Sequence, residues 1–525
     1  MRTILFGLDG ATFTVLDHMM AEGIMPNLKA FCQTGVRAKL RSTTLPMTPQ
    51  AWTSMATGRG MGHHGINDFV RIEIRDDSVY AKYNTSTDIK CDTIWKYASR
   101  NDRRVTVLNY IGLAPPEPIN GHSIPGFVPS RHLRRSSFPA DLFNRLKEAE
   151  KFNIRLMGLE LDFEKKALSQ MPDEQWLPWI EHHIAREEAW FGTLEHLMIN
   201  EPSDLTAIVF DGVDKIQHLA YRFLGPECLP ADPTPWQSEV MQRCRDYFQQ
   251  VDGYLGRTRE LLGEEGRIFI ASDHGFSAST EIFYVNKFLH DEGLLVWKEQ
   301  PKGDENETIF VDKLQNHLDL IDIKRTKAFA LTPSSNGIFI NVPPEEYDEF
   351  RGQLIDKLFQ IKGPDGGQVV TEAKTREEGF PGPYENHAPD LTLTLRDFGV
   401  ISVLNASDVV IPRSQPWGTH HPDGVLMASG PGLRSGVEVE RRDIVEVTSL
   451  LAHSLSLAIP ADYEGEFPES FYEADYLADD PPRIGDSAEC PISQDADGGD
   501  DSGEEFSEED EAIVLQRLRS LGYIE

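Results

Sequence analysis

The sequence predicts an α/β protein with a mostly parallel central sheet flanked by helices. Two observations predict this class. Short apolar runs of strand length alternate with longer amphipathic segments, and several of the apolar runs end directly in an acid. The expected strands are 3–8, 105–109, 206–210, 267–271, 391–395 and 425–429. The expected helices are 49–57, 174–198 and 238–262.

The rest of the chain interrupts or follows this pattern. Segments of about 66–205 and 279–415 are mixed and contain proline, and they are expected to be insertions that cap a site. Residues 1–460 are therefore expected to form one large domain. Residues 461–507 are rich in Asp, Glu, Gly and Ser, which predicts a disordered acidic linker. Residues 508–525 regain a helical period and are expected to form an amphipathic helix.

Composition excludes several classes of protein. Apolar residues make up 40% of the 525 residues, which is enough for a sizeable core and excludes a wholly disordered chain. The formal net charge of −34 repels a phosphate backbone, so binding to a DNA or RNA duplex is not expected. Residues 462–511 hold 20 acids and one base, so 19 of these net negative charges lie in that stretch.

The five cysteines are scattered and form no C-x-x-C pair, so neither a disulfide framework nor a thiolate zinc site is expected. No stretch approaches the roughly 20 apolar residues of a membrane span. The expected location is cytoplasmic.

Acids and histidines gather where the expected strands end. The carboxyl ends of parallel strands meet at one edge of a sheet, so these side chains are expected to converge there. Mixed carboxylate and imidazole ligands suit Zn²⁺ or Mn²⁺, and six of them are too many for one tetrahedral ion, which predicts two divalent ions. The residues are Asp9, Asp214, His218, Asp273, His274 and His420.

Each signal also has an ordinary structural explanation. An Asp after a strand is most often a helix cap, and Asp214 with His218 is a common exposed pair on a helix. Thr48 before Pro49 is a good helix cap, although a hydroxyl at a helix N-terminus also suits phosphate chemistry. The run Gly60-Met61-Gly62-His63-His64-Gly65 fits G-x-G-x-x-G but follows a helix, so it fails as a dinucleotide-binding motif. The convergence of several such signals favours a functional site.

Taken together, the motifs resemble the alkaline phosphatase superfamily, and most closely its type I phosphodiesterase/nucleotide pyrophosphatase branch. The motifs are Gly7-Leu8-Asp9-Gly10, Thr48, His64-Gly65-Ile66, Asp214-x-x-x-His218, Ser272-Asp273-His274-Gly275 and Gly418-Thr419-His420. The resemblance implies an alkaline-phosphatase-like fold and a phosphohydrolase that cleaves a phosphodiester or pyrophosphate bond. It implies one ion held by Asp214, His218 and His420, and a second held by Asp9, Thr48, Asp273 and His274. Thr48 is then the nucleophile that forms a phosphothreonine intermediate.

One departure from the branch concerns Ala51, where the resemblance implies an Asn that holds a phosphoryl oxygen; Gln50 is a candidate substitute. The C/S-x-P-x-R element of sulfatases is missing at Thr48, whereas a mutase or a monoesterase of the same superfamily stays open. The expected partner is a small phosphorylated substrate, such as a nucleotide.

Two further expectations are weaker. Arg131, Arg134 and Arg135 are candidates for gripping an anionic substrate. A non-catalytic scaffold whose acidic tail binds a protein partner is the alternative from another class.

Overall fold

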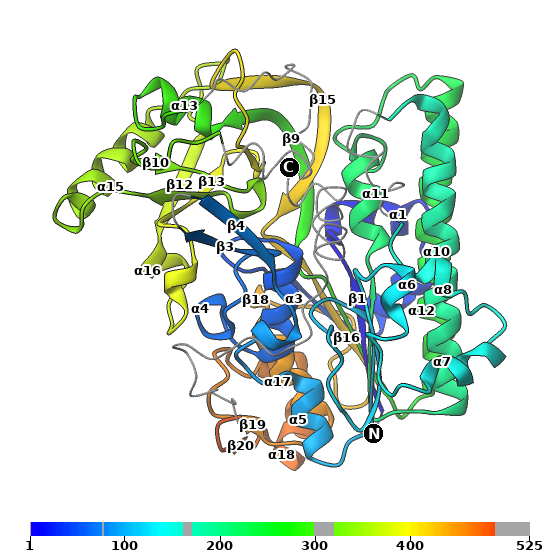
Figure 1. Ribbon diagram of the computed structural model, residues 1–525. Coiled ribbons are helices and arrows are strands. Elements are labelled where there is room, and N and C mark those ends of the chain that lie inside the picture. Colours follow the sequence, from blue (N-terminus) through cyan, green and yellow to red (C-terminus); the bar gives the residue numbers. More distant parts are fainter. Residues whose placement is uncertain (1, 76–77, 161–170, 299–319, 489–525) are drawn as a thin grey trace.

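A mixed sheet of nine strands forms the centre of the computed structural model, which describes residues 2–75, 78–160, 171–298 and 320–488 (Figure 1). Its strand order is β17-β2-β16-β8-β1-β7-β5-β6, with β18 also paired to β2. Only β16 runs antiparallel to its neighbours in this sheet, which confirms the predicted mostly parallel arrangement. The strands are β1 Thr3–Leu8, β2 Val36–Arg41, β5 Val105–Tyr110, β6 Gly121–Pro125, β7 Leu205–Phe210, β8 Arg267–Ala271, β16 Asp423–Ser429, β17 Val437–Glu438 and β18 Arg442–Asp443.

Helices cover both faces of the central sheet, which explains why β1 is apolar throughout and completely buried. Ile4 and Phe6 of β1 pack against α1 Phe13–Ala21, α2 Pro26–Gln33, α10 Asp173–Asn200, α11 Gly212–Ala220 and α12 Pro235–Leu262. Leu5 packs on the opposite face against α3 Thr48–Thr57, α5 Ile94–Arg100 and α17 Glu446–Ser454. Three of these helices, α3, α10 and α12, contain the predicted ranges 49–57, 174–198 and 238–262.

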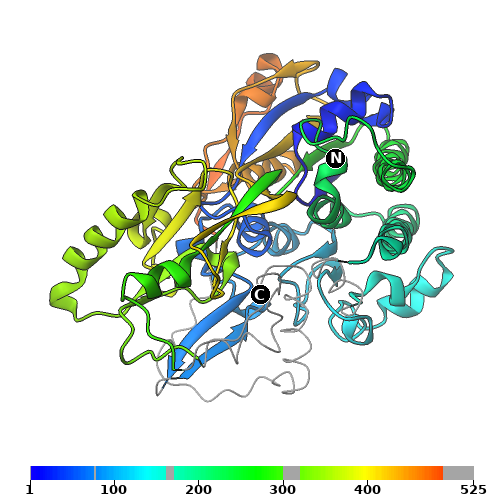
Figure 2. The ribbon, with the colours of Figure 1, turned by 90° about the horizontal axis from the view of Figure 1, so that it is seen from above.

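The second insertion forms a cap with its own core. Its two sheets have the orders β10-β11-β13-β12 and β14-β9-β15. The elements are β9 Gly275–Tyr284, α13 Val285–Asp291, β10 Ala328–Phe329, β11 Gly337–Ile340, α15 Pro344–Phe359, β12 Val370–Thr375, α16 Arg376–Gly379, β13 Leu391–Leu395, β14 Ile401–Ser402 and β15 Val410–His421. Viewed from above, the remaining cap elements lie on one side of β9 and β15, and the helices α10 and α12 lie on the other (Figure 2).

The strand predicted at 391–395 exists but does not belong to the central sheet. As β13 it pairs antiparallel with β11 and β12 in the cap. The sequence Leu-Thr-Leu-Thr-Leu suits either position, because periodicity defines a strand but not its partners. Leu45 and Met47, just before α3, share a hydrophobic cluster with Leu331 of the cap.

The first insertion is only partly separate from the central sheet. β5 and β6 add two parallel strands at the edge of that sheet, next to β7. The segment also carries the hairpin β3 Val70–Arg75 and β4 Ser78–Tyr83. Its short helices are α6 Ser130–Leu133, α7 Leu142–Arg145 and α8 Ile154–Met157, and α4 Met61–His64 precedes it.

The structure differs from the expectation of a disordered linker over 461–488. This stretch contains α18 Ala474–Asp479, and β20 Ile484–Gly485 pairs with β19 Ile459–Pro460. Phe471 and Tyr472 are buried in the same cluster as α3 and α17, so these aromatic side chains anchor the segment despite its many acids. The expected linker residues 489–507 and the expected helix 508–525 lie outside the described residues.

Candidate functional site

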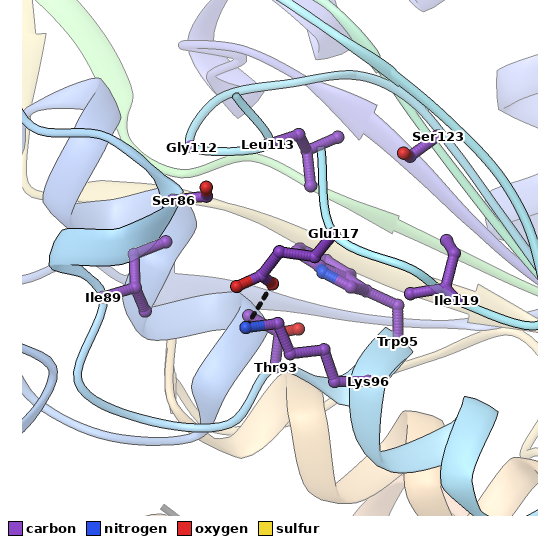
Figure 3. Close-up of a pocket in the computed structure, with 10 residues that line it drawn as sticks. All are labelled: Ser86, Ile89, Thr93, Trp95, Lys96, Gly112, Leu113, Glu117, Ile119 and Ser123. Atoms are coloured by element: carbon purple, nitrogen blue, oxygen red, sulfur yellow. Dashed lines mark ion pairs between the residues drawn. The ribbon is translucent and has the colours of Figure 1, made fainter. Parts of the chain in front are cut away.

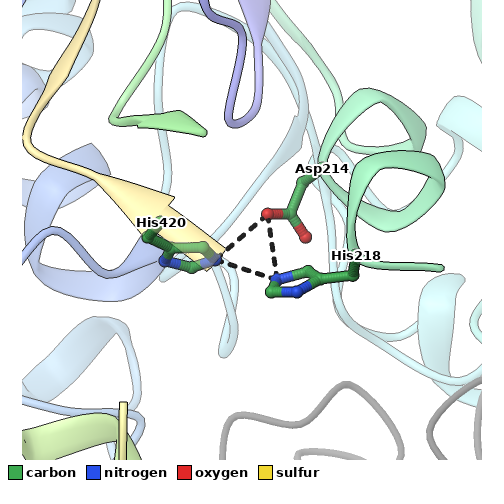
Figure 4. Close-up of side chains that lie close together, drawn as sticks. All are labelled: Asp214, His218 and His420. Carbon is green, nitrogen blue, oxygen red and sulfur yellow. Dashed lines mark hydrogen bonds and ion pairs between the residues drawn. The ribbon is translucent and has the colours of Figure 1, made fainter. Parts of the chain in front are cut away.

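One group of potential metal ligands consists of Asp214, His218 and His420 (Figure 4). Asp214 and His218 lie one turn apart on α11, and His420 comes from β15. The Nε2 atoms of His218 and His420 are 2.9 Å apart, and they lie 3.4 Å and 3.2 Å from Asp214 Oδ1. His420 Nδ1 donates to the carbonyl of Pro46 at 2.7 Å, which leaves Nε2 as the ligand atom that faces the group.

A second group consists of Asp9, Asp273 and His274, at the carboxyl ends of the neighbouring strands β1 and β8. All three side chains are completely buried. His274 Nε2 lies 3.3 Å from Asp273 Oδ2 and 3.6 Å from Asp9 Oδ1. The structure therefore brings together six of the residues predicted from the sequence, in two groups divided as the resemblance implies.

The two groups adjoin each other. The rings of His274 and His420 stack with centroids 3.6 Å apart, and His274 Nε2 lies 4.0 Å from Asp214 Oδ1. Gly10 lies between the groups with φ of 66°, and its N–H donates to Asp273 Oδ1. A Cβ atom at Gly10 would lie 2.8 Å from the Phe276 ring, so the position requires glycine.

The electrostatics of the site suit cations. Burial and the nearby Asp273 and Asp214 raise the pKa of Asp9 well above its ordinary value, and burial raises the pKa of Asp273 to about 8. Burial lowers the pKa of His274, which keeps this imidazole neutral and able to bind a metal. Both carboxylate oxygens of Asp9, Asp273 Oδ2 and His274 Nε2 are buried, and none of these atoms has a hydrogen-bond partner among the described residues. Unpartnered, inward-facing acceptors of this kind fit divalent cations, so the residues present match the expected two-ion site.

Thr48 is the first residue of α3 and is completely buried. The cap position belongs to Met47, one residue earlier than the sequence predicts, because Thr48 already has helical geometry ahead of Pro49. The hydrogen bond from His420 to the Pro46 carbonyl fixes the chain two residues before Thr48 against the first ligand group. The positive end of the α3 dipole therefore lies beside the first group of potential metal ligands.

Other predicted residues have different surroundings. Ala51 is buried in the cluster between the sheet and α17. Gln50 is also completely buried, and neither atom of its amide group has a partner. Arg134 donates to Asn144 and Arg131 to His132, which are local contacts within the first insertion.

The run Gly60 to Gly65 forms α4 and its flanks. A Cβ atom at Gly62 would lie 2.3 Å from the carbonyl oxygen of Phe380, so this glycine allows the cap backbone to approach. His64 lies 2.9 Å from Ser54 of α3 through Nε2. The motif therefore joins α3 to the cap and has a structural explanation.

Two further features have no clear signal in the sequence. Asn67 follows His64-Gly65-Ile66, and its buried amide has no hydrogen-bond partner; that motif was the only available signal. The second feature is a buried ion pair between Arg186 of α10 and Asp211, at the start of α11. Lys215 Nζ lies 3.0 Å from the same carboxylate. Arg186 and Asp211 are 25 positions apart in the sequence, so no local pattern indicates that they pair.

A separate hollow lies beside α5 and the loop before β6 (Figure 3). Trp95, Leu113 and Ile119 line it, and an ion pair joins Lys96 to Glu117 across it. None of the six potential metal ligands lines this hollow. It is therefore distinct from the candidate site.

Comparisons with solved structures show the same fold. Murine ectonucleotide pyrophosphatase/phosphodiesterase 5 matches with a TM-score of 0.52 and 13% identity, over 90% of this chain and all of that one. An inactive variant of that protein in complex with AMP matches with a TM-score of 0.52 and 13% identity, over 89% of this chain and 97% of that one. Phosphonoacetate hydrolase from Sinorhizobium meliloti 1021, in complex with phosphonoacetate, matches with a TM-score of 0.50 and 15% identity, over 86% of this chain and 95% of that one.

No curated protein sequence matches the chain. Within the described residues, every helix is too short or too polar to cross a bilayer. Residues 3–423, which include all the predicted site residues, match the family model for type I phosphodiesterase/nucleotide pyrophosphatase. The chain therefore belongs to the type I phosphodiesterase/nucleotide pyrophosphatase family, whose members are phosphoric ester hydrolases.

Proposed function

We propose that this protein hydrolyses a phosphodiester or phosphoanhydride bond in a small substrate, through a phosphothreonine intermediate on Thr48. The observation that carries the proposal is the contact between His420 and the Pro46 carbonyl, which brings the start of α3 next to two adjoining groups of potential metal ligands. A hydroxyl at a helix N-terminus next to cation ligands suits attack on phosphorus, because both features favour negative charge on oxygen.

Two divalent ions are proposed as cofactors, one held by Asp214, His218 and His420, and the other by Asp9, Thr48, Asp273 and His274. The mixture of imidazole and carboxylate ligands favours Zn²⁺, with Mn²⁺ as the alternative. When bound, such ions supply Lewis acidity, which lowers the pKa of a bound hydroxyl and stabilises charge on the phosphoryl and leaving oxygens.

In the proposed reaction, Thr48 Oγ1 forms a bond to phosphorus while the bond to the leaving oxygen breaks, and the leaving oxygen takes up a proton. Water then attacks the phosphothreonine and restores the hydroxyl. The positive end of the α3 dipole favours negative charge on a phosphoryl oxygen beside Thr48. The amides of Gln50 and Asn67 have no hydrogen-bond partner in the described part of the chain. We propose them as further donors in place of the Asn that the resemblance implies where this chain has Ala51.

Phosphomutase or phosphomonoesterase activity is the second candidate, since the same two ligand groups serve each of these reactions. A panel of phosphodiesters, phosphomonoesters, nucleotides and sugar phosphates separates the candidates. A cytoplasmic location is proposed with the function, because the four cysteines in the described part of the chain, Cys32, Cys91, Cys228 and Cys244, form no disulfide with one another.

The direct test is Thr48→Ala, assayed with bis(p-nitrophenyl) phosphate after purification with Zn²⁺. We expect turnover to fall at least about a thousandfold, because the nucleophile is lost. Thr53→Ala is the matched control: Thr53 is also a buried threonine of α3, and its hydroxyl donates to the Pro49 carbonyl. That variant is expected to keep its turnover. Near-normal turnover in Thr48→Ala would exclude Thr48 as the nucleophile.

A further inference from the structure

In a strongly acidic chain, Arg222 has no carboxylate partner among the residues that the structure describes. It lies in η3, Tyr221–Phe223, the short helix that follows α11. Within the described residues, its guanidinium makes no hydrogen bond and no ion pair, and its Nε atom is buried without a partner. Burial lowers the pKa of Arg222. The negative charge of Asp173 acts in the opposite direction, but the two side chains are too far apart to form an ion pair. A partly desolvated cation without a counter-ion indicates a place for an anion.

An aromatic platform holds this guanidinium in place. Its central carbon lies 5.0 Å from the centroid of Trp176 and 4.7 Å from that of Phe223. Trp236 packs edge-on against both rings, at 5.4 Å and 6.0 Å. The platform orients Arg222 by cation–π contact, which leaves its N–H groups available for hydrogen bonds to a ligand.

Arg222 follows two of the potential metal ligands in the same helical stretch of the chain. Asp214, His218 and Arg222 follow one another at intervals of four residues along α11 and η3, or about one helical turn each. Tyr221 stacks on Phe276 at 6.1 Å, and the same phenyl ring contacts His218 at 4.8 Å.

The platform lies at the same edge of the sheet as the metal ligands. Trp176 and Trp236 lie in the first turns of α10 and α12, the helices that lead into β7 and β8. Since each helix returns the chain to the start of the next parallel strand, these first turns lie at the carboxyl edge of the sheet.

We propose that Arg222 binds a second anionic group, a phosphate or a carboxylate, on the part of the substrate that is not cleaved. This inference rests on the proposed function, which supplies the class of substrate. It adds a preference for substrates that carry a second negative charge. A guanidinium binds either oxyanion through two parallel N–H donors, so the ligand chemistry is the same for both.

The test compares the binding of two small phosphonates to zinc-loaded protein by isothermal titration calorimetry. Methylphosphonate carries one anionic group, and 3-phosphonopropionate adds a carboxylate on a flexible spacer. The wild type is expected to bind 3-phosphonopropionate at least about tenfold more tightly than methylphosphonate, and Arg222→Met to lose this preference. Arg222→Lys keeps the charge but not the paired donors, and is expected to keep only part of the preference.

Arg259→Met is the matched control. Arg259 also lies over an aromatic ring, that of Phe31, but in the last turn of α12 at the opposite edge of the sheet. This variant loses the same charge and is expected to retain the wild-type preference. Equal preferences in the wild type and in Arg222→Met, or no preference in the wild type, would overturn the inference. The readout is binding, so it is independent of turnover: a wild type that discriminates between the ligands but hydrolyses no diester would contradict only the proposed function.

Discussion

At the residue scale, Asp68 shows how one buried carboxylate joins the cap to the core. It lies between the motif residue Ile66 and the hairpin β3–β4, and it is 8% exposed. Its oxygens accept hydrogen bonds from the hydroxyls of Thr332 and Ser334, at 2.8 Å each, and from the N–H of Phe69. Burial outweighs these donors and raises the pKa of Asp68 to about 6. The contact thus fixes a cap loop against the segment that follows α4.

This residue gives a prediction for the pH dependence of stability. The folded pKa of about 6 exceeds the ordinary value of 3.8, so between these pH values the folded state holds a proton that the unfolded state has lost. The contribution of Asp68 to stability therefore decreases as pH rises from about 4 to about 6, by roughly 3 kcal/mol in total. Asp68→Asn is expected to remove this slope from urea unfolding measured across pH 4 to 7.

Asp232→Asn, which changes an exposed carboxylate, is the control and is expected to keep the wild-type slope. A wild type and an Asp68→Asn variant with the same pH profile would show that Asp68 ionises at its ordinary pH. The difference in pH profile between Asp68→Asn and the wild type separates the contribution of Asp68 to stability from the contributions of the other buried acids.

At the scale of elements, long-range polar contacts set where the ligand-bearing helix α11 begins. Arg186 of α10 pairs with Asp211, and Asn109 at the end of β5 donates to the same carboxylate at 3.0 Å. Glu187, also of α10, accepts from the N–H of Gly212 at 2.7 Å. Two separate elements, α10 and β5, thus hold the first turn of α11, which carries Asp214.

The segment 461–488 is also positioned by packing contacts that no local sequence pattern indicates. Its Phe471 is completely buried, in the cluster that also contains Trp52 of α3. Asp462 pairs with Arg59 at 2.7 Å, next to the C-terminal end of α3. These contacts attach the segment directly to the helix that begins at Thr48.

Phe471→Ala is therefore expected to destabilise the protein by about 3–5 kcal/mol, as for other large-to-small changes in a core. Ile484→Ala in the same segment is the control, because this side chain is 67% exposed, and it is expected to leave stability unchanged. Urea unfolding measures both variants. If the two variants unfold at the same urea concentration, the segment does not contribute to the core.

At the scale of the whole molecule, the candidate site concentrates negative charge in the interior of an already acidic protein. Asp9 and Asp273 are completely buried at the centre of the sheet edge, and the chain carries a formal net charge of −34. Their raised pKa values show that these carboxylates resist ionisation without a cation. Bound ions and the stability of the fold are therefore expected to be linked.

Removal of metal with EDTA is expected to abolish diester hydrolysis and to lower the melting temperature, and added Zn²⁺ is expected to restore both. Calorimetry and elemental analysis of the same samples measure this. Asp273→Asn is expected to bind less metal, yet to be more stable than the metal-free wild type at pH 9. At that pH the Asp273 carboxyl, with a pKa of about 8, must otherwise ionise beside Asp9. Full activity in a metal-free sample, or an unchanged melting temperature, would contradict the linkage.

The sequence alone determined the features that depend on local spacing. Asp9 and Asp273 follow apolar runs of strand length, and parallel strands bring such ends to one edge. Asp214 and His218 are four residues apart, which places both on one face of a helix. These patterns are visible over a few residues, so the two ligand groups and the mostly parallel sheet were predictable.

Only the tertiary structure decided which surfaces meet. It placed the strand 391–395 in the cap, because a strand's own pattern does not select its partner. It ordered residues 461–488, because a few aromatic side chains found a complementary surface among many acids. It paired Arg186 with Asp211 and left Arg222 without a carboxylate partner among the described residues, although the sequence around neither arginine indicates this. Burial and pairing are properties of two surfaces in contact, and the chain specifies them only through the whole fold.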